Sequence, residues 1–236
     1  MSGLVEQVAA TFGWTLARTN MIVEGTSDAA LMNHASELHR MVHGVPVLDQ
    51  NFAVIAAGHG DDGGVDGVSR RLTAMLQIAE SDRAANGALR YRFGGLYDND
   101  HAGRTAFDLL SRTDPRIRRY TETFLLHPAM PAIGDGISDR LIEATTLNFP
   151  FRGLDWEIED FCSDRLLAKF ERENPGAVVA RNAVNGRTHR DIARPAKAEL
   201  VSLFIAEATI EDARHLLGLL STLRGYMGVA HDFVKG

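Results

Sequence analysis

The sequence predicts an α/β protein with a mostly parallel four-stranded sheet flanked by helices, followed by a helical C-terminal extension. The main observation is the order of segments. Apolar runs typical of strands alternate with helical spacing as β-α-β-α-β-α-β, which favours a parallel sheet with right-handed crossovers. The second is size, because 236 residues with 45% hydrophobic content can bury a full core. The third is a change of pattern after Leu126, so we expect a core over residues 1–130 and an extension over 131–236.

Each expected element follows from its pattern of apolar residues. Strands are expected at residues 20–24, 52–57, 91–97 and 120–126. Helices are expected at residues 3–12, 27–42, 65–81, 102–112, 156–174 and 195–225, with a Pro/Gly loop over 127–136 and a polar, Asn/Gly-containing connection between the last two helices. Thr26 or Ser27 can cap the second helix. Asp28 lies in its first turn, where the helix dipole favours negative charge.

Composition narrows the classes of function. The net charge of −6 argues against a protein that holds nucleic acid through its overall field, and favours local basic patches, bound metal or a partner. A single cysteine, Cys162, excludes an internal disulfide and a cysteine-rich zinc site, and it is most simply a small buried apolar residue. No secretory signal or membrane-spanning run is evident, so we expect a cytoplasmic protein without membrane contact.

Two acidic motifs follow strand-like runs. Glu24-Gly25, with Asp28 close behind, follows the first expected strand, and Asp98-Asn99-Asp100 follows the third. Residues just past the carboxyl ends of parallel strands line the crevice where ligands bind. Two carboxylates about 4 Å apart near a protein surface repel by about 4 kcal/mol, and a hard divalent cation removes this cost. The sequence therefore predicts a Mg²⁺ or Mn²⁺ site with one or two ions, although Asp28 is equally explained as a dipole complement.

Two other motifs contain Asp-x-Asp. An EF-hand loop starting at Asp98 would need ligands where the chain has Ala102 and Leu109. A haloacid-dehalogenase-type phosphatase usually has Thr or Val where Ala102 stands, and its Asp pair usually opens the fold. Both motifs therefore fit the chain poorly.

Both motifs together resemble the signature of the TOPRIM domain, which is shared by topoisomerases, bacterial primases, small RNA-maturation nucleases and OLD-family (overcoming lysogenization defect) nucleases. The matching residues are Glu24, Gly25, Asp28, Asp98, Asp100, Ala102, Gly103 and Arg104. The resemblance covers about residues 18 to 130 and implies a Rossmann-like TOPRIM fold. It implies that Glu24 is a metal ligand and proton-transfer residue, and that Asp98 and Asp100 are catalytic metal ligands. Arg104 starts a helix whose N–H groups could face a phosphate, or it is an ordinary solvated residue.

Three later segments are candidates for completing this site. In OLD-family nucleases an acidic segment supplies carboxylates to a second metal, and Glu159, or Glu157, resembles it here. Those nucleases also carry a lysine that stabilises transition-state charge, which Lys197 resembles. The loop of residues 58–67, with His59, Asp61, Asp62 and Asp66, is expected at the same edge, as a substrate gate or as a plain acidic loop. Basic residues that could contact phosphates are Arg181, Arg187, Arg190 and Arg194, unless they form a solvated face.

The expected function is therefore metal-dependent phosphodiester hydrolysis of DNA, with RNA left open as the substrate. OLD-family TOPRIM domains are usually fused to an ATPase, and the chain has no Gly-x-x-x-x-Gly-Lys-Ser/Thr loop. We therefore expect the effector of a partner-regulated defence or genome-maintenance system, with an ATPase as a candidate partner and oligomeric state left open. The alternatives are a small TOPRIM RNA-processing nuclease and a non-catalytic TOPRIM binding module. The chain is too short for a topoisomerase, and it lacks the zinc cysteines of a recombination mediator.

Overall fold

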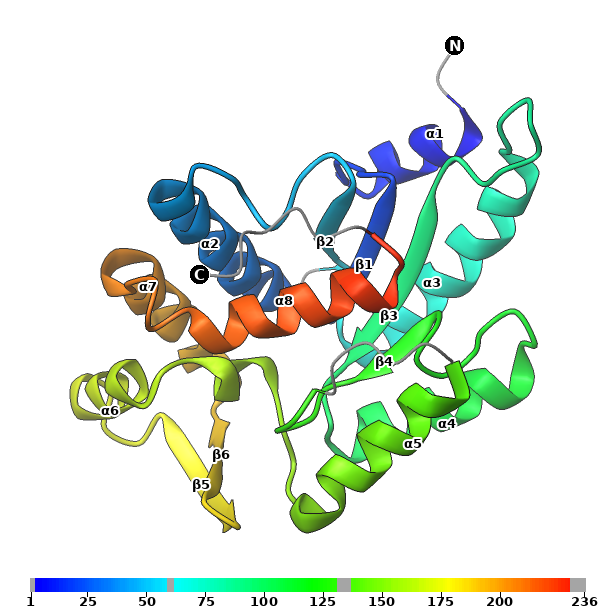
Figure 1. The fold of residues 1–236 in the computed structure, drawn as a ribbon. Coiled ribbons are helices and arrows are strands. Elements are labelled where there is room, and N and C mark those ends of the chain that lie inside the picture. The colour runs from blue at the N-terminus through cyan, green and yellow to red at the C-terminus, as the bar shows by residue number, and fades with distance from the viewer. Residues whose placement is uncertain (1–2, 59–61, 131–136, 230–236) are drawn as a thin grey trace.

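A computed structural model describes residues 3–58, 62–130 and 137–229 of the chain (Figure 1). Four parallel strands form one sheet in the order β2-β1-β3-β4. The strands are β1 (Thr19–Val23), β2 (Phe52–Ala56), β3 (Arg92–Tyr97) and β4 (Thr123–Leu125). This confirms the predicted α/β class and the parallel four-stranded sheet. The fourth strand is shorter than predicted, and Tyr120 lies outside it with a positive φ of 56°.

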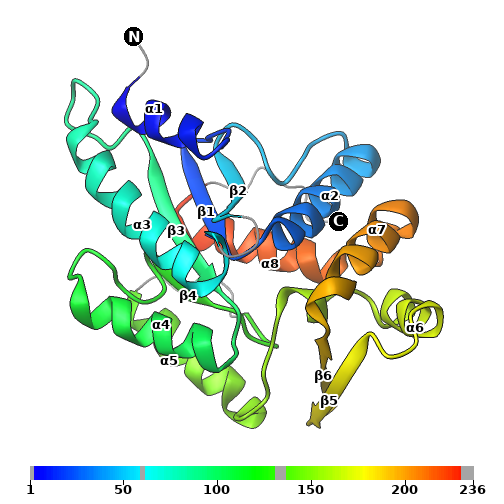
Figure 2. The same cartoon turned by 180° about the vertical axis from the view of Figure 1, so that it is seen from behind.

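Helices cover both faces of the sheet (Figures 1 and 2). α2 (Thr26–His43) and α8 (Arg214–Tyr226) pack together on one face, while α3 (Gly64–Ser81) and α4 (His101–Thr113) lie on the other, and α1 (Leu4–Thr11) contacts α3. Since both faces are covered, all of β1 is buried.

Two glycines of β3 let these layers approach the sheet closely. A Cβ at Gly94 would lie 3.2 Å from the sulfur of Met227, at the end of α8, whereas a Cβ at Gly95 would lie 2.9 Å from a methyl group of Val68 on α3. Successive strand residues point to opposite faces, so the two glycines serve the two layers separately.

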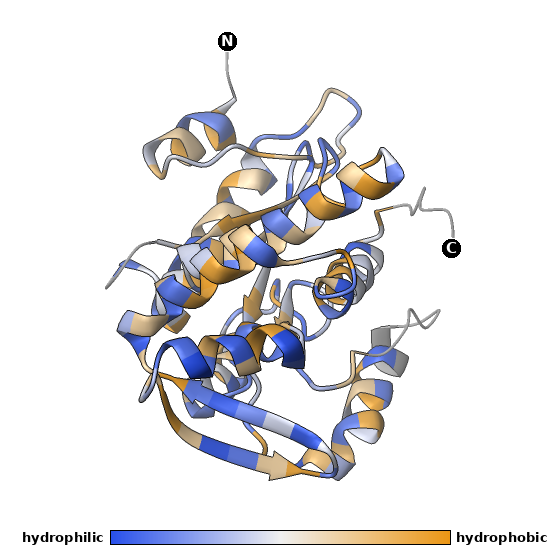
Figure 3. Cartoon of the chain, turned by 90° about the vertical axis from the view of Figure 1, so that its left-hand side faces the viewer, coloured by the Kyte–Doolittle hydropathy of each residue, from blue (hydrophilic) through white to orange (hydrophobic). Residues whose placement is uncertain are grey.

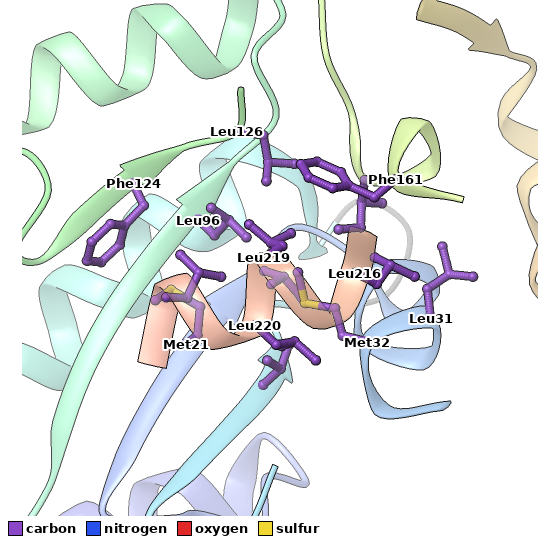
Figure 4. Packing of buried hydrophobic residues seen from close by; sticks show 14 of the residues in the cluster. Met21, Leu31, Met32, Leu96, Phe124, Leu126, Phe161, Leu216, Leu219 and Leu220 are labelled. Carbon is purple, nitrogen blue, oxygen red and sulfur yellow. The ribbon is translucent and has the colours of Figure 1, made fainter. Parts of the chain in front are cut away.

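The main core lies between the strands, α2 and α8. Figure 4 shows Leu219 and Leu220 of α8 on the side of Leu96 and Met21, in β3 and β1, and Leu216 beside Leu31 and Met32 of α2. α8 is therefore part of the core of the sheet although it lies near the end of the described chain. The predicted boundary at residue 130 remains a prediction.

The C-terminal half differs from the sequence prediction in three places. The predicted helix over 156–174 is wrong: a 3₁₀ turn, η3 (Ile158–Phe161), precedes the shorter helix α6 (Asp164–Glu173), whose N-cap is Ser163. The predicted helix over 195–225 consists of a 3₁₀ turn, η4 (Arg194–Ala196), and two helices, α7 (Lys197–Glu207) and α8. A helix that was not predicted, α5 (Ile137–Asn148), and the turn η2 (Phe149–Phe151) precede them. Residues 131–136 of the predicted loop lie outside the described residues.

The break between α7 and α8 has a clear cause in Asp212. This carboxylate is buried and accepts hydrogen bonds from the backbone N–H and hydroxyl of Thr209, at 2.9 and 2.7 Å, and from Ser163 and Arg165. These bonds hold residues 208–213 in a turn that cannot continue as a helix.

The polar connection that we expected between the last two helices is an antiparallel hairpin, β5 (Val178–Val184) and β6 (Arg187–Ile192). Asn185 and Gly186 close it, both with positive φ, as a two-residue hairpin turn requires. Figure 3 shows the hairpin as mostly hydrophilic, in agreement with the exposure of most of β5. No helix in the described ranges is long and apolar enough to span a membrane.

Candidate functional site

The candidate site lies where the strand order of the sheet reverses. From β1 the chain moves to β2 on one side, and later to β3 on the other side, so the carboxyl ends of β1 and β3 flank a topological switch point. Ligands of open α/β sheets bind in the crevice outside such a point. Glu24 and Asp98 are the first residues after these two strands, and the Asp98 N–H donates to Glu24 Oε1 at 3.1 Å. The structure thus brings together two residues separated by 74 positions.

Asp28 reaches the same place from the first turn of α2. Its Oδ2 accepts a hydrogen bond from the backbone N–H of Gly25 at 2.8 Å, and the residue is buried. This bond caps α2 and confirms that Asp28 lies in the first turn of the helix, whereas its role as a metal ligand stays a prediction. A small cavity of about 10 Å³ is lined by Asp28, Glu24 and Asp98 together with five apolar residues, Val23, Met32, Leu96, Leu126 and Ile158. Its volume matches about one water-sized particle.

Asp100 faces the helix that follows it. Its Oδ1 accepts from the Gly103 N–H at 2.6 Å and caps α4. Gly103 is required there, because a Cβ would lie 1.9 Å from the carbonyl oxygen of Asp98. Asp100 is not among the residues that line the small cavity, although its charge acts on Glu24.

The acidic segment of residues 155–161 lies against the same loop. Asn99 and Trp156 exchange two backbone hydrogen bonds, at 2.8 and 3.2 Å, which fix this segment beside the Asp-x-Asp motif. Glu157 and Glu159 then meet Lys197 at the start of α7, whose Nζ lies 3.0 Å from a carboxylate oxygen of each. Glu159 is only 2% exposed, and among the described residues neither of its oxygens has a partner with hydrogen-bond geometry.

The pKa values of these groups reflect a buried, mutually repelling cluster. Burial, followed by repulsion from Asp28 and Asp100, raises the pKa of Glu24 to about 7. Burial and the nearby Glu159 raise the pKa of Asp28 to about 7, and burial and Glu24 hold the pKa of Asp98 well above its usual range. Carboxyl groups with pKa values near neutrality are candidates for proton transfer.

Lys197 provides the positive charge of this cluster. Burial alone would lower its pKa, but the carboxylates of Glu159 and Glu157 outweigh this effect and raise it. Burial raises the pKa of Glu157 despite its contact with Lys197. The ammonium group therefore stays charged at neutral pH.

The donor set fits a hard divalent cation by its chemistry. Every candidate ligand is a carboxylate, and Glu159 is a buried carboxylate whose charge is met by Lys197 at 3.0 Å without hydrogen-bond geometry, so its oxygens could also serve a bound cation. In the described part of the chain, however, no three His, Cys, Asp or Glu side chains are arranged to hold a metal ion as they stand. Glu24, Asp28 and Asp100 accept from backbone N–H groups, and Glu157 accepts from Lys197. Metal binding would require some of these side chains to turn away from their present contacts.

The predicted phosphate-contact arginines have different surroundings. Arg104 donates to the backbone and side-chain oxygens of Asn99 and forms an ion pair with Asp155 at 2.9 Å, so it braces the Asp-x-Asp loop. Arg181 and Arg190 both form ion pairs with Glu171. Of these predicted arginines, Arg187 and Arg194 are exposed and form no ion pair among the described residues.

The sequence analysis missed a supporting chain of polar contacts behind the Asp-x-Asp motif. The Asn99 side chain lies 3.2 Å from His127 Nδ1, and His127 Nε2 lies 2.7 Å from the hydroxyl of Tyr120. Burial lowers the pKa of His127 to about 4, so its imidazole is neutral. The only available signal was that Tyr120 and His127 lie at the two ends of the predicted fourth strand, and neither residue belongs to a motif.

The described C-terminal part of the loop, residues 62–67, lies beside Glu24, in agreement with its place after β2. Gly64 donates to the backbone carbonyl of Glu24 at 2.9 Å, and a Cβ at Gly63 would lie 2.7 Å from the same oxygen. Asp62 and Asp66 are exposed, whereas His59 and Asp61 lie outside the described residues.

Comparison of the chain with known protein families, curated proteins and solved structures found no match.

Proposed function

We propose that the chain is a metal-dependent nuclease that hydrolyses phosphodiester bonds of DNA. The observation that carries this proposal is the meeting of Glu24, Asp28, Asp98 and Glu159 at the switch point of the sheet, where burial and mutual repulsion raise the pKa values of the first three. Several buried carboxylates with one nearby ammonium group lower the stability of the folded protein. Such groups are typical of sites that bind a ligand or carry out a reaction.

We extend the proposal to the fold family. A parallel sheet of order β2-β1-β3-β4, with a Glu-Gly motif after β1 and an Asp-x-Asp motif after β3, supports a TOPRIM-type domain of the OLD kind. The antiparallel pairing of Asn99 with Trp156 supports the idea that the segment containing Glu157 and Glu159 completes the site.

Each residue has a distinct role in this proposal. Glu24, Asp28 and Asp98 would hold Mg²⁺ or Mn²⁺, with Glu159 as a further oxygen donor. The cation would polarise a phosphoryl oxygen and make water more acidic. Glu24, with a pKa of about 7, can accept a proton near neutral pH. The ammonium group of Lys197 would oppose the negative charge that develops on the phosphate.

The test is cleavage of supercoiled plasmid with Mn²⁺ or Mg²⁺. We expect Asp98→Asn and Glu24→Gln to lose at least about a hundredfold in nicking rate, because each removes a charge needed in the transition state. Glu211→Gln makes the same charge change at an exposed residue remote from the cluster and should cut normally. Normal cutting by either cluster variant would refute the assignment.

The contacts of Lys197 favour a second candidate, a regulated effector that is closed when alone. Lys197 forms ion pairs with both Glu157 and Glu159 and would compete with a metal ion for their carboxylate oxygens. On this proposal the isolated protein cuts slowly with Mn²⁺, and a partner such as an ATPase accelerates it. Rapid cutting by the isolated chain would instead identify an autonomous nuclease, and a lack of both cutting and Mn²⁺ binding would favour a binding module.

A further inference from the structure

A second cavity lies beside the carboxylate cluster, on the other side of the acidic segment. It has a volume of about 300 Å³, at the lower end of the range of small-molecule sites. We call it the hairpin pocket, because β6, the hairpin turn and α8 form its walls. Its apolar floor consists of Pro128, Met130, Trp156, Phe161 and Leu219.

Two arginines that line the hairpin pocket form no ion pair among the described residues. They are Arg187, beside the hairpin turn, and Arg214, in the first turn of α8. Both are exposed, and both act on His215, which also lines the pocket. Burial and these two arginines lower the pKa of His215, so its ring is neutral and can donate or accept a hydrogen bond at neutral pH.

The acidic residues of the hairpin pocket are already engaged. Asp160 accepts from His189, from the backbone N–H of Arg190 and from that of Glu157. Asp164 lies 3.3 Å from Arg190 but is 93% exposed. Because three arginines, Arg187, Arg190 and Arg214, line the pocket against the two carboxylates Asp160 and Asp164, the lining as a whole favours an anion.

The hairpin pocket also has a direct structural link to the carboxylate cluster. The acidic segment presents Glu157 and Glu159 to Lys197, whereas Trp156 and Phe161 line the pocket. The two aromatic rings meet edge to face, with centroids 6.0 Å apart. A ligand in the pocket would therefore lie against the same short segment that supplies two carboxylates to the proposed metal site.

We propose that the hairpin pocket binds one nucleotide, with its phosphate between Arg187 and Arg214 and its base on the apolar floor. A nucleotide combines the two chemistries that the pocket offers, a dianionic phosphate for the arginines and a flat apolar ring for the floor. Only the role of the hairpin pocket rests on the proposed function: the pocket would hold a nucleotide of the substrate near the carboxylate cluster. The bound nucleotide is either free or the end of a DNA strand.

The test is calorimetric binding of dAMP to the full chain in EDTA, so that no metal or catalysis is involved. We expect deoxyadenosine and inorganic phosphate to bind at least about tenfold more weakly than dAMP, because each lacks one half of the recognised group. Arg187→Gln and Arg214→Gln should each weaken binding at least about tenfold by removing a charge-assisted hydrogen bond. Arg172→Gln, at an exposed arginine of α6 outside the pocket, should bind like the wild type.

A second arm distinguishes the source of the nucleotide. A fluorescent single-stranded oligodeoxynucleotide with a 5′-phosphate is titrated under the same conditions, and dAMP is added as a competitor. Binding of dAMP alone identifies a free nucleotide, and binding of the oligonucleotide with dependence on both arginines identifies a strand end. Undiminished binding of every probe by both arginine variants, or no binding of any probe, would overturn the proposal. Because these measurements exclude metal, they remain interpretable if Asp98→Asn cuts normally and the nuclease assignment fails.

Discussion

Glu24→Gln should stabilise the metal-free protein at alkaline pH, although it removes a residue of the proposed catalytic centre. The folded protein raises the pKa of Glu24 from an ordinary 4.5 to about 7. A carboxyl group whose pKa is higher in the folded protein binds more protons when folded. The free energy of unfolding therefore falls as pH rises from about 4.5 to about 7 and stays low above that range. Glutamine keeps the carbonyl oxygen that accepts from the Asp98 N–H but carries no charge.

The size of the effect follows from the pKa difference. The pKa of Glu24 rises by about 2.5 on folding, and each pKa unit corresponds to about 1.4 kcal/mol. Ionised Glu24 therefore lowers the free energy of unfolding by about 3 kcal/mol. Part of this effect is repulsion between Glu24 and Asp28, and the ionisation of Asp28 changes when residue 24 is neutral. We therefore expect Glu24→Gln to raise the free energy of unfolding by about 1–3 kcal/mol at pH 8. For a chain of this size that raises the melting temperature by about 2–10 °C. At pH 5 wild-type Glu24 is protonated when folded, and the difference should nearly vanish.

Thermal unfolding followed by circular dichroism, at pH 5 and pH 8, measures this effect in EDTA and in Mn²⁺. With Mn²⁺ at about a hundred times its dissociation constant, the wild type should gain about 2.7 kcal/mol, and Glu24→Gln much less. Glu211→Gln is the control for a surface charge change and should behave like the wild type at both pH values. A Glu24→Gln protein that is less stable than the wild type at pH 8 in EDTA would refute the reasoning. So would an equal change at both pH values.

Two further substitutions test the frame of the site. Lys197→Met should destabilise the protein by about 3–5 kcal/mol at pH 8, because it leaves Glu157 and Glu159 buried without their cation. At pH 5 this loss of stability should be smaller, because the carboxyl groups become protonated. Urea unfolding at the two pH values measures the loss, and a loss that does not depend on pH would contradict the prediction. Gly103→Ala should lower the melting temperature and abolish nicking, since its Cβ would meet the Asp98 carbonyl, whereas Gly218→Ala on α8, with open space around its Cβ, should not lower the melting temperature.

The sheet could be predicted from the sequence because its signals are local. Apolar runs such as Met21-Ile22-Val23 end at residues that start a helix, and Glu24 and Asp98 were placed at one edge by the rule for parallel strands alone. The C-terminal half depends on contacts that sequence spacing does not contain. Asp212 breaks a pattern that is otherwise helical, and its partners Thr209 and Ser163 come from either side of the hairpin.

The hairpin could have been found, because Asn185-Gly186 is a strong two-residue turn signal. It was missed because β5 is exposed on most of its length, and its short apolar run, residues 177–180, gives way at once to the polar pair Arg181-Asn182. The pairing of Asn99 with Trp156 had no signal, since it depends on backbone groups of segments 57 positions apart. The same holds for the hairpin pocket, whose arginines are separated in sequence and meet only through the position of β6 beside α8.

The cost of the carboxylate cluster is the strongest physical reason to expect a function there. Two buried charges elsewhere in the described chain are paired: Asp212 with Arg165, and Arg224 with Asp49. At the switch point Lys197 is the one cation close to Glu157 and Glu159 among the described residues, and its charge must also offset Glu24, Asp28 and Asp98. Apolar side chains in those positions would give a more stable protein. A concentration of destabilising buried charge in one crevice is typical of a binding or catalytic site, so Glu24→Gln should gain stability where it loses activity.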